Sequence, residues 1–293
     1  MHSPMVSIVM PSLNQADFIE EAIESVLNQD HAPIELIVSD GGSTDATIEI
    51  LKSFSRIHDN IFWESQPDGG PAEAIARSLA KVRGEIVGWL NSDDLYAARA
   101  LREAVSAFSR NPEWIMCYGR GSYINSTGHT TGRYPTKRPS VGIRGFDSGC
   151  FICQPTVFFK ASLPSILGSP NTDLKTAFDY EYWIRAFKAF PERIGFIDSE
   201  LARSRLHEDC ITERMRETVA LEGLAIGREH LGGAKLHWAA TYVEELRSTS
   251  GHDVELFNTK LRSFIDAARS YLKYDQLEKL TTALIDSVST PDS

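Results

Sequence analysis

The chain has 293 residues, of which 42% are hydrophobic and 24% are charged, as in a globular protein with one large domain or one domain and an appendage. Its formal net charge of -10 argues against a nucleic-acid partner, because an acidic surface repels polyanions. No apolar run approaches the roughly 20 residues that cross a bilayer, and Met1–Val9 lacks the pattern of a signal peptide. We therefore expect a soluble, cytoplasmic protein.

The first ninety residues alternate short apolar runs with segments of helical period. The expected strands are Val6–Met10, Ile34–Ser39, Ile61–Glu64 and Ile86–Leu90. Apolar residues at steps of three and four predict helices over Phe18–Leu27, Asp45–Phe54 and Pro71–Val82. Repeated strand and helix units of this kind predict an α/β fold with a mostly parallel central sheet flanked by helices.

The simple alternation weakens after residue 95. Helical pattern recurs at Ala98–Arg110 and Tyr180–Phe190, and strand-like runs are Ile115–Tyr118, Phe151–Lys160, Gly195–Asp198 and Leu201–Leu206. From Thr212 to near Ser287 the pattern is helical throughout. We expect a catalytic or binding domain over residues 1–210 and a helical appendage over residues 211–293.

Four cysteines, at 117, 150, 153 and 210, are too few for a disulfide framework in a chain of this length. Cys150 and Cys153 have the C-x-x-C spacing of a redox or zinc half-site. The two residues between them are apolar, and no second pair or histidine cluster lies nearby. Buried free thiols are the better interpretation.

The segment Arg133–Arg144 carries four basic side chains and two prolines but no acid. It is typical of a mobile basic loop, since proline interrupts regular structure. Either a solvated loop or a lid that contacts an acceptor is consistent with this pattern.

Polar turns follow each of the first four expected strands: Pro11–Asn14, Asp40–Asp45, Asp68–Gly70 and Asn91–Asp94. Each alone is an ordinary turn. In a parallel sheet, however, the four turns share the edge at which α/β proteins bind ligands. Two adjacent carboxylates in the last turn suit a divalent cation that holds a phosphate, and also suit a helix cap.

Two phosphate-binding motifs are missing from the sequence. No G-x-x-x-x-G-K-[ST] occurs, and no G-x-G-x-x-G follows the first strand. The sequence therefore does not support the prediction of a P-loop protein or of a dinucleotide-binding dehydrogenase. Gly41 and Gly42 permit a tight turn, and Asp40 can accept hydrogen bonds from a base or a ribose.

The motifs in this order resemble the family 2 glycosyltransferases, which have the GT-A fold. They are Val6–Asn14, Ser25–Gln29, Asp40–Asp45, and Gly84–Ile86 leading to Asn91–Asp94, and the resemblance covers roughly residues 5–210. It implies an inverting enzyme with a nucleotide-sugar donor, most simply a UDP-sugar, and a glycan or lipid-linked acceptor. It also implies a divalent cation, Mn²⁺ or Mg²⁺.

The resemblance assigns the donor site residue by residue. Pro11, Ser12, Asn14 and Asp40 would hold the nucleoside, with Asp40 near the base. Asp93 would lie by the ribose, and Asp94 matches the last acid of the family's D-x-D motif, which binds the metal.

Two departures from the family pattern are visible. Gly41 stands where many members carry a second Asp, and Ala76 and Ser78 stand where Asn and Gly are frequent. The second departure leaves donor-sugar contacts around Asp68 and Ala74 in doubt.

The segment Phe178–Arg185 resembles the family's acidic motif near the acceptor, with Asp179 at the position of the catalytic base. Inverting transfer needs such a group, because the acceptor hydroxyl loses its proton while it attacks the anomeric carbon. A cap at the helix N-terminus is the alternative role of an acid there. Glu181 is the second candidate.

Further along, the resemblance extends to an Arg-x-His element. Arg205 could meet the diphosphate and His207 could be a further metal ligand. A surface or packing role is equally open for this histidine. Trp89 and Trp183 lie beside the expected site, where either sugar stacking or core packing would suit an indole, with packing favoured.

The alternatives to a glycosyltransferase are a nucleotidyltransferase and a carbohydrate-binding protein that keeps the fold without catalysis. The first usually has a basic, glycine-rich loop after the first strand, where this chain has Pro11–Asn14. The helices after Thr212 could pack normally or lie peripherally on a membrane, and their apolar residues favour packing. The donor sugar, the acceptor and the oligomeric state stay open.

Overall fold

The structure is a computed structural model that describes residues 3–251, 253–278 and 280–281. The chain forms two compact units, Met1–Gly142 with Cys150–His207 and Ile143–Gly149 with Glu208–Ser293. The second unit therefore includes a short segment, Ile143–Gly149, that is remote in sequence from the division expected at residue 210. The last part of the helical pattern expected up to Ser287 lies outside the described residues.

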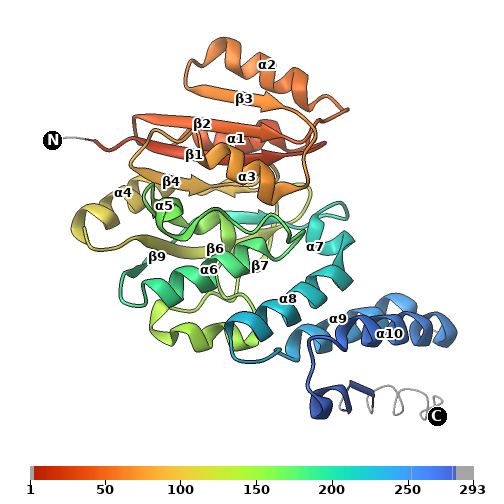
Figure 1. Ribbon diagram of the computed structural model, residues 1–293. Coiled ribbons are helices and arrows are strands. Elements are labelled where there is room, and N and C mark those ends of the chain that lie inside the picture. The colour runs from red at the N-terminus through yellow and green to blue at the C-terminus, as the bar shows by residue number, and fades with distance from the viewer. Residues whose placement is uncertain (1–2, 252, 279, 282–293) are drawn as a thin grey trace. The chain divides into compact units, whose positions relative to one another are not determined.

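In the described residues, nine strands form one mixed sheet in the first unit. Four of them are β1 (Val6–Ser12), β2 (Ile34–Asp40), β3 (Ile61–Ser65) and β4 (Ile86–Trp89). They are parallel and lie in the order β3-β2-β1-β4 (Figure 1). The four strands expected from the sequence are confirmed, and their carboxyl ends share one edge of the sheet.

The rest of the sheet is mixed in direction. It contains β5 (Leu95–Tyr96), β6 (Met116–Ile124), β7 (Thr130–Arg133), β8 (Phe158–Lys160) and β9 (Ile194–Arg205). The strand β8 joins the two halves, because it pairs antiparallel with both β4 and β6. The long strand β9 runs parallel to β6 and antiparallel to β5.

Two strand predictions are corrected by the structure. The run Phe151–Lys160 is a strand only from Phe158, because Gln154–Thr156 forms a 3-10 turn, η3, around Pro155. The two runs expected over 195–198 and 201–206 are one strand, β9, which keeps its pairing with β6 through register shifts.

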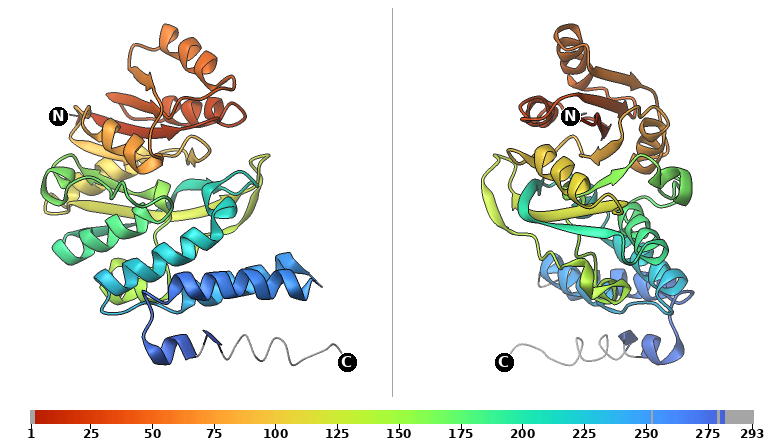
Figure 2. Two further views of the ribbon diagram at one scale, coloured as in Figure 1. Left: turned by 45° about the vertical axis from the view of Figure 1, so that its right-hand side comes forward. Right: turned by 90° about the vertical axis from the view of Figure 1, so that its left-hand side faces the viewer.

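Helices cover both faces of the parallel strands. The first-unit helices are α1 (Ile19–Leu27), α2 (Thr47–Ile57), α3 (Pro71–Leu79), α4 (Ala100–Arg110), α5 (Leu163–Leu167) and α6 (Phe178–Ala189). The helix α1 lies behind the strands and α3 in front of them (Figures 1 and 2). The face that α1 buries consists of Ile19, Ala22, Ile23 and Val26, which confirms the predicted helical period.

The second unit is built from helices. They are α7 (Ile211–Arg214), α8 (Arg216–His230), α9 (His237–Ser250) and α10 (Val254–Ala268), with a 3-10 segment, η2 (Ile143–Ser148). The apolar residues Leu261, Phe264, Ile265 and Ala268 of α10 are buried in the core of this unit, in line with the packing role expected for the helices after Thr212. Within the described residues, no helix is long and apolar enough to span a bilayer.

The four cysteines are free thiols. Cys117 and Cys153 are buried, whereas Cys150 and Cys210 are half-buried. Burial raises the pKa of Cys150 and of Cys153 above the usual thiol range. These thiols are therefore mainly protonated packing groups, as the sequence indicated.

The basic segment is partly regular and is held to the sheet. Arg133 ends β7, and Pro139–Val141 forms a 3-10 turn, η1. The Arg138 Nη2 lies 2.6 Å from the Asp198 Oδ2, and its guanidinium lies over the Phe196 ring. This contact anchors the middle of the segment on β9.

Glu35 links β2 to β1 and to the loop before β4, and its removal is expected to destabilise the first unit. Its carboxylate, which is 2% exposed, accepts hydrogen bonds from the Ser7 hydroxyl and from the backbone and side chain of Arg83. We expect Glu35→Gln to lower the free energy of unfolding at pH 7 by about 2 kcal/mol, measured by urea denaturation. The exposed Glu24→Gln should change it by less than about 0.5 kcal/mol.

The stability that the Glu35 carboxylate contributes should decrease as the pH falls. Burial opposes ionisation of Glu35, but the hydrogen bonds from Ser7 and Arg83 outweigh it, so the pKa is lowered from 4.5. Because the folded pKa lies below the unfolded one, the stabilisation is full above about pH 4.5 and is lost as the pH falls through the folded pKa. A difference between wild type and Glu35→Gln that grew on acidification would contradict this account.

Candidate functional site

The turn after β1 is joined to the turn after β2. Pro11 and Ser12 end β1 and are buried, while Asn14 has a positive φ of 52° and is exposed. The Asn14 side-chain amide oxygen accepts a hydrogen bond from the Thr44 backbone N–H at 2.8 Å, and the Asn14 backbone N–H donates to the Ser43 hydroxyl at 2.7 Å. The Ser12 hydroxyl is buried and has no protein partner among the described residues.

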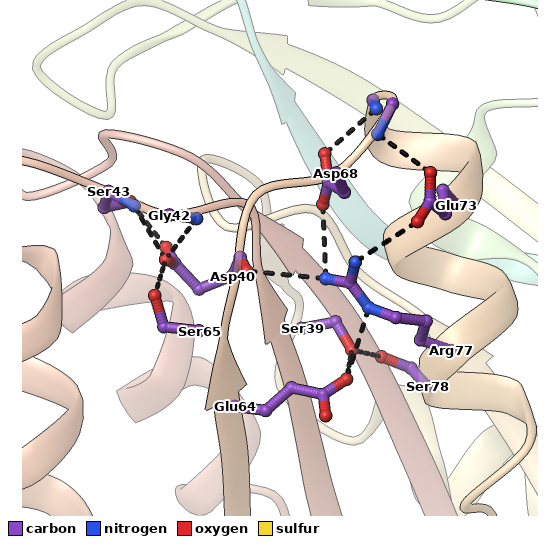
Figure 3. A network of polar contacts seen from close by, with 12 residues as sticks. Ser39, Asp40, Gly42, Ser43, Glu64, Ser65, Asp68, Glu73, Arg77 and Ser78 are labelled. Carbon is purple, nitrogen blue, oxygen red and sulfur yellow. Dashed lines mark hydrogen bonds and ion pairs between the residues drawn. The ribbon is translucent and has the colours of Figure 1, made fainter.

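Asp40 is enclosed by its own turn. Its Oδ2 accepts hydrogen bonds from the backbone N–H groups of Gly42 and Ser43 and from the Ser65 hydroxyl, at 2.9, 2.8 and 2.7 Å. Its Oδ1 accepts from the Ser43 hydroxyl at 2.5 Å. Figure 3 shows this carboxylate pointing toward Gly42, Ser43 and Ser65. Because the side chain is fully buried, Asp40 shapes the turn rather than presenting an oxygen at the surface.

Asp68 and Arg77 form the centre of a second polar cluster (Figure 3). The Asp68 Oδ1 accepts from the Gly70 backbone at 2.9 Å, and its Oδ2 accepts from the Arg77 Nη2 at 3.2 Å. Arg77 also lies 3.3 Å from Glu64 and 3.6 Å from Glu73. Arg77 is not among the site residues expected from the sequence. The only hint in the sequence that Arg77 could reach this edge was its position on the helix that follows the Asp68 turn.

Asp93 and Asp94 point in different directions although they are adjacent. The Asp94 carboxylate is buried, and it accepts hydrogen bonds from the Arg205 backbone at 2.8 Å and from the Asn91 amide at 3.3 Å. Asn91 in turn accepts from the Trp89 indole at 3.2 Å. Burial, and then the charge of Asp93, raise the pKa of Asp94 well above its usual value. Asp94 is thus an internal member of the turn.

Asp93 faces His207. The His207 Nε2 lies 3.2 Å from the Asp93 Oδ2, and the Phe18 ring packs on the imidazole with centroids 4.6 Å apart. The other contact of Phe18 is the Arg205 guanidinium, 5.0 Å from the ring centre. The sequence predicts Asp94 and His207 as metal ligands. The structure brings His207 to Asp93, whereas the Asp94 carboxylate is turned inward.

The chemistry of this pair suits Mn²⁺ better than Mg²⁺, because both ions bind carboxylates, whereas an imidazole is a ligand of transition metals. In the described part of the chain, no three carboxylate, thiol or imidazole groups gather closely enough to hold a metal alone. An ion held by Asp93 and His207 would thus take further oxygen ligands from a bound diphosphate or water.

Arg205 is a buried anchor. Its guanidinium donates to the backbone oxygens of Asp93, Asn125 and Ser126 at 2.7, 3.2 and 3.1 Å, and to the Glu21 carboxylate at 2.6 Å. Only 1% of its side chain is exposed. The expected contact of Arg205 with a diphosphate is therefore replaced by a structural role, because these four acceptors occupy its guanidinium.

We expect Arg205→Met to lower the free energy of unfolding by about 3 kcal/mol, because it leaves buried carbonyl oxygens without donors. Glu21→Gln is the matched control, since Glu21 is 55% exposed and should change the free energy by less than about 1 kcal/mol. Urea denaturation of both variants measures the difference. If both variants lost the same small amount of unfolding free energy, an anchoring role for Arg205 would be excluded.

The helix α6 carries both candidate bases, and their surroundings differ. Glu181 is buried and lies 2.7 and 3.0 Å from the Nε and Nη2 of Arg185. This bidentate pair occupies the Glu181 carboxylate. Asp179 lies in the first turn, where its Oδ1 accepts from the Tyr180 backbone at 2.7 Å. The pairing with Arg185 argues against Glu181 as a proton acceptor, and Asp179 stays the first candidate expected from the sequence.

An aromatic contact fixes the start of α6 at the end of β4. Phe178 stacks on Trp89 with centroids 5.6 Å apart and an interplanar angle of 13°, and Trp183 lies 5.8 Å from the same indole. Both tryptophans are buried, so they are packing residues. Since Asp179 follows Phe178, and the Asn91–Asp94 turn follows Trp89, the stack links the candidate base to the candidate metal turn.

The chain is similar in sequence to known glycosyltransferases. The chain matches Glycosyl transferase family 2 over residues 7–163. It is 32% identical to an uncharacterized glycosyltransferase of Haemophilus influenzae, over 80% of this chain and 93% of the relative. It is 27% identical to an uncharacterized glycosyltransferase of Rickettsia typhi over 71% of this chain, and spans 65% of that relative's length.

Two solved structures share the fold. The structure of Staphylococcus aureus TarS residues 1–349 with UDP-GlcNAc has a TM-score of 0.66 and 19% identity, covering 96% of this chain and 88% of TarS. The mannosyltransferase PcManGT of Pyrobaculum calidifontis, solved with GDP-Man and Mn²⁺, has a TM-score of 0.60 and 20% identity, covering 99% and 82%. The expected GT-A fold is thus confirmed. The chain belongs to glycosyl transferase family 2.

Proposed function

We propose that this chain is an inverting, metal-dependent glycosyltransferase that moves a sugar from a UDP-sugar to a hydroxyl group of a glycan or lipid-linked acceptor. The observation that carries the proposal is the pairing of Asp93, in the turn after β4, with His207, which follows β9; the two side chains are 3.2 Å apart. The edge of the sheet at which β1 to β4 end is where α/β folds bind their ligands. Complexes of similar proteins with UDP-GlcNAc and with GDP-Man and Mn²⁺ support a nucleotide-sugar donor.

The donor lies across the ends of the parallel strands in this proposal. The Ser12 hydroxyl, which lacks a protein partner in the part of the chain that the structure describes, bonds the nucleoside, and Asn14 borders it. Asp93 and His207 hold Mn²⁺ or Mg²⁺, which reassigns the metal from Asp94 to its neighbour. When bound, the cation supplies Lewis-acid neutralisation of the charge that develops on the departing diphosphate.

Asp179 performs the proton transfer. It accepts the proton of the acceptor hydroxyl while that oxygen attacks the anomeric carbon and the bond to the diphosphate oxygen breaks. A single displacement of this kind inverts the anomeric configuration, and it needs no covalent enzyme intermediate. The stack of Phe178 on Trp89 keeps the first turn of α6 beside the end of β4, and thus keeps the base near the donor.

Release of UDP from a panel of UDP-sugars, in the presence of Mn²⁺ and after chelation by EDTA, tests the proposal. We expect release that requires the cation and an acceptor glycan, and a product of opposite anomeric configuration by NMR. Transfer of a nucleoside monophosphate would instead indicate a nucleotidyltransferase. Sugar binding without turnover would indicate a binding protein that keeps the fold. Retention of configuration would exclude the single displacement.

A further inference from the structure

The loop between α5 and α6 is attached to the turn that follows β3. The Lys175 Nζ donates a hydrogen bond to the Gly69 backbone oxygen at 2.9 Å, across a separation of 106 residues. The Gly69 N–H donates to the Glu73 carboxylate at 2.8 Å, so both backbone groups of this glycine are used. Lys175 is therefore attached to a turn that α3 itself holds.

The start of the same loop is held by the helix that the loop precedes. The Arg185 guanidinium donates to the backbone oxygens of Leu167 and Ser169, at 2.5 and 2.9 Å. The Asn171 side chain accepts a hydrogen bond from the Asp173 backbone at 3.0 Å, which forms a local turn. The loop is thus built from defined contacts, although most of its residues are exposed.

The first turn of α6 depends on support of this kind, because its N-cap residue is Ala177. An alanine side chain accepts no hydrogen bond, so this position gives the first backbone N–H groups no side-chain cap of the kind that Ser, Thr, Asp or Asn supplies. Helix ends fray where contacts do not hold them. Asp179, the proposed base, lies in this turn, so its position depends on the contacts that fix the chain before it.

Two contacts join the start of α6 to separate points on the edge of the sheet. Phe178 stacks on Trp89 at the end of β4, and Lys175 reaches Gly69 after β3. Because β1 and β2 lie between β3 and β4, the two contacts bracket the strand ends at which the proposed donor lies. The ends of β3 and β4 are three strand spacings apart, on the order of 14 Å. The chain from Lys175 to Phe178 spans at most about 11 Å, so the long lysine side chain completes the distance.

We propose that Lys175 is a positioning residue, whose bond to Gly69 fixes the chain before α6 and thereby places the Asp179 carboxylate beside the donor. This inference rests on the proposed role of Asp179 as the base. Lys175 itself takes no part in the proton transfer. An ammonium group suits the contact, because a charged donor binds a backbone oxygen more strongly than a neutral donor does.

Lys175→Met tests this role, because methionine keeps an apolar stem and lacks the N–H donors. We expect kcat for sugar transfer to fall about tenfold, since a misplaced reacting group slows the reaction, and the Kd for UDP to stay within about threefold of wild type. Lys175→Arg keeps a charged donor and should have a kcat close to that of wild type. Lys188→Met, at an exposed lysine in the last turn of the same helix, should change kcat by less than about twofold.

A double variant shows whether Lys175 acts through Asp179. In Asp179→Asn the base is already lost, so the addition of Lys175→Met should lower kcat by less than about twofold. A further loss as large as the one that Lys175→Met causes in the wild-type chain would show that Lys175 acts independently of Asp179. That result would overturn the inference.

Hydrogen exchange measures the position of the loop without turnover. We expect the backbone amides of residues 171–180 to exchange about tenfold faster in Lys175→Met than in wild type, at an unchanged temperature of unfolding. Lys175→Arg should restore the wild-type exchange rates. Unchanged exchange of this segment in Lys175→Met, or faster exchange throughout the first unit, would overturn the positioning role.

The outcomes separate this inference from the proposed function. If Asp179→Asn lost activity but Lys175→Met kept a kcat within about twofold of wild type, the role of Lys175 would be overturned and the proposed base would stand. If Asp179→Asn kept the activity of wild type, the proposed base would be overturned, and the inference with it.

Discussion

Replacement of Asp179 by Asn is expected to lower the rate of sugar transfer by about 10²- to 10⁴-fold and to leave the affinity for UDP nearly unchanged. The amide has the shape of the carboxylate but cannot accept the proton of the acceptor hydroxyl. Steady-state kinetics with UDP release as the signal measures the rate, and titration of UDP measures the affinity. A kcat within threefold of wild type would remove Asp179 from the reaction.

The matched control is Glu181→Gln, on the same helix. Because Glu181 is paired with Arg185 and buried, this change should lower the stability rather than remove a proton acceptor. We expect thermal unfolding at a lower temperature and a kcat much closer to wild type than that of Asp179→Asn. The reverse ranking of the two rates would assign the base to Glu181.

His207→Ala is expected to raise the Mn²⁺ concentration for half-maximal activity by about 100-fold or more, because it removes one of the two proposed protein ligands. Asp93→Asn should act in the same direction, since an amide is a weaker ligand than a carboxylate. Titration of Mn²⁺ into the chain followed by electron paramagnetic resonance gives the affinity independently of turnover. Unaltered Mn²⁺ binding in both variants would exclude this pair as the metal site.

Asp94→Asn separates the two neighbouring acids. In the structure Asp94 accepts hydrogen bonds from Arg205 and Asn91, so its substitution should mainly reduce stability. We expect its Mn²⁺ affinity to stay within about threefold of wild type, once the folded fraction is equal. A larger loss of Mn²⁺ affinity in Asp94→Asn than in Asp93→Asn would return the metal to Asp94, as the D-x-D motif alone suggests.

The parallel half of the sheet could be predicted because its signals are local. The strands β1, β2 and β4 are buried on both faces, so each is a nearly continuous apolar run that a polar turn follows. The helix period of α1 is equally plain. The segment Phe151–Lys160 misled for the same reason, because its apolar residues are buried although only its end is a strand. Its middle is the 3-10 turn η3, which side-chain hydrogen bonds to the backbone oxygens of Cys153 and Trp89 hold.

Which residues of the candidate site face outward was beyond sequence reasoning. The motifs located the right turns, but neighbouring side chains in a turn point in directions that their partners decide. Asp40 and Asp94 are turned inward by donors from Ser65 and Arg205, which lie 25 and 111 residues away. Arg205 likewise has the charge of a phosphate ligand but is enclosed by carbonyl oxygens.

The sequence by itself determined the class of fold, the four turns at the edge of the sheet and the family, because each depends on residues close together in the chain. Only the tertiary structure decided that His207 meets Asp93, that Lys175 contacts Gly69, and that Glu181 is paired with Arg185. The first two depend on segments that are distant in sequence, and the third on the burial of one helix face. Buried polar groups must find partners, and the identity of those partners is set by packing.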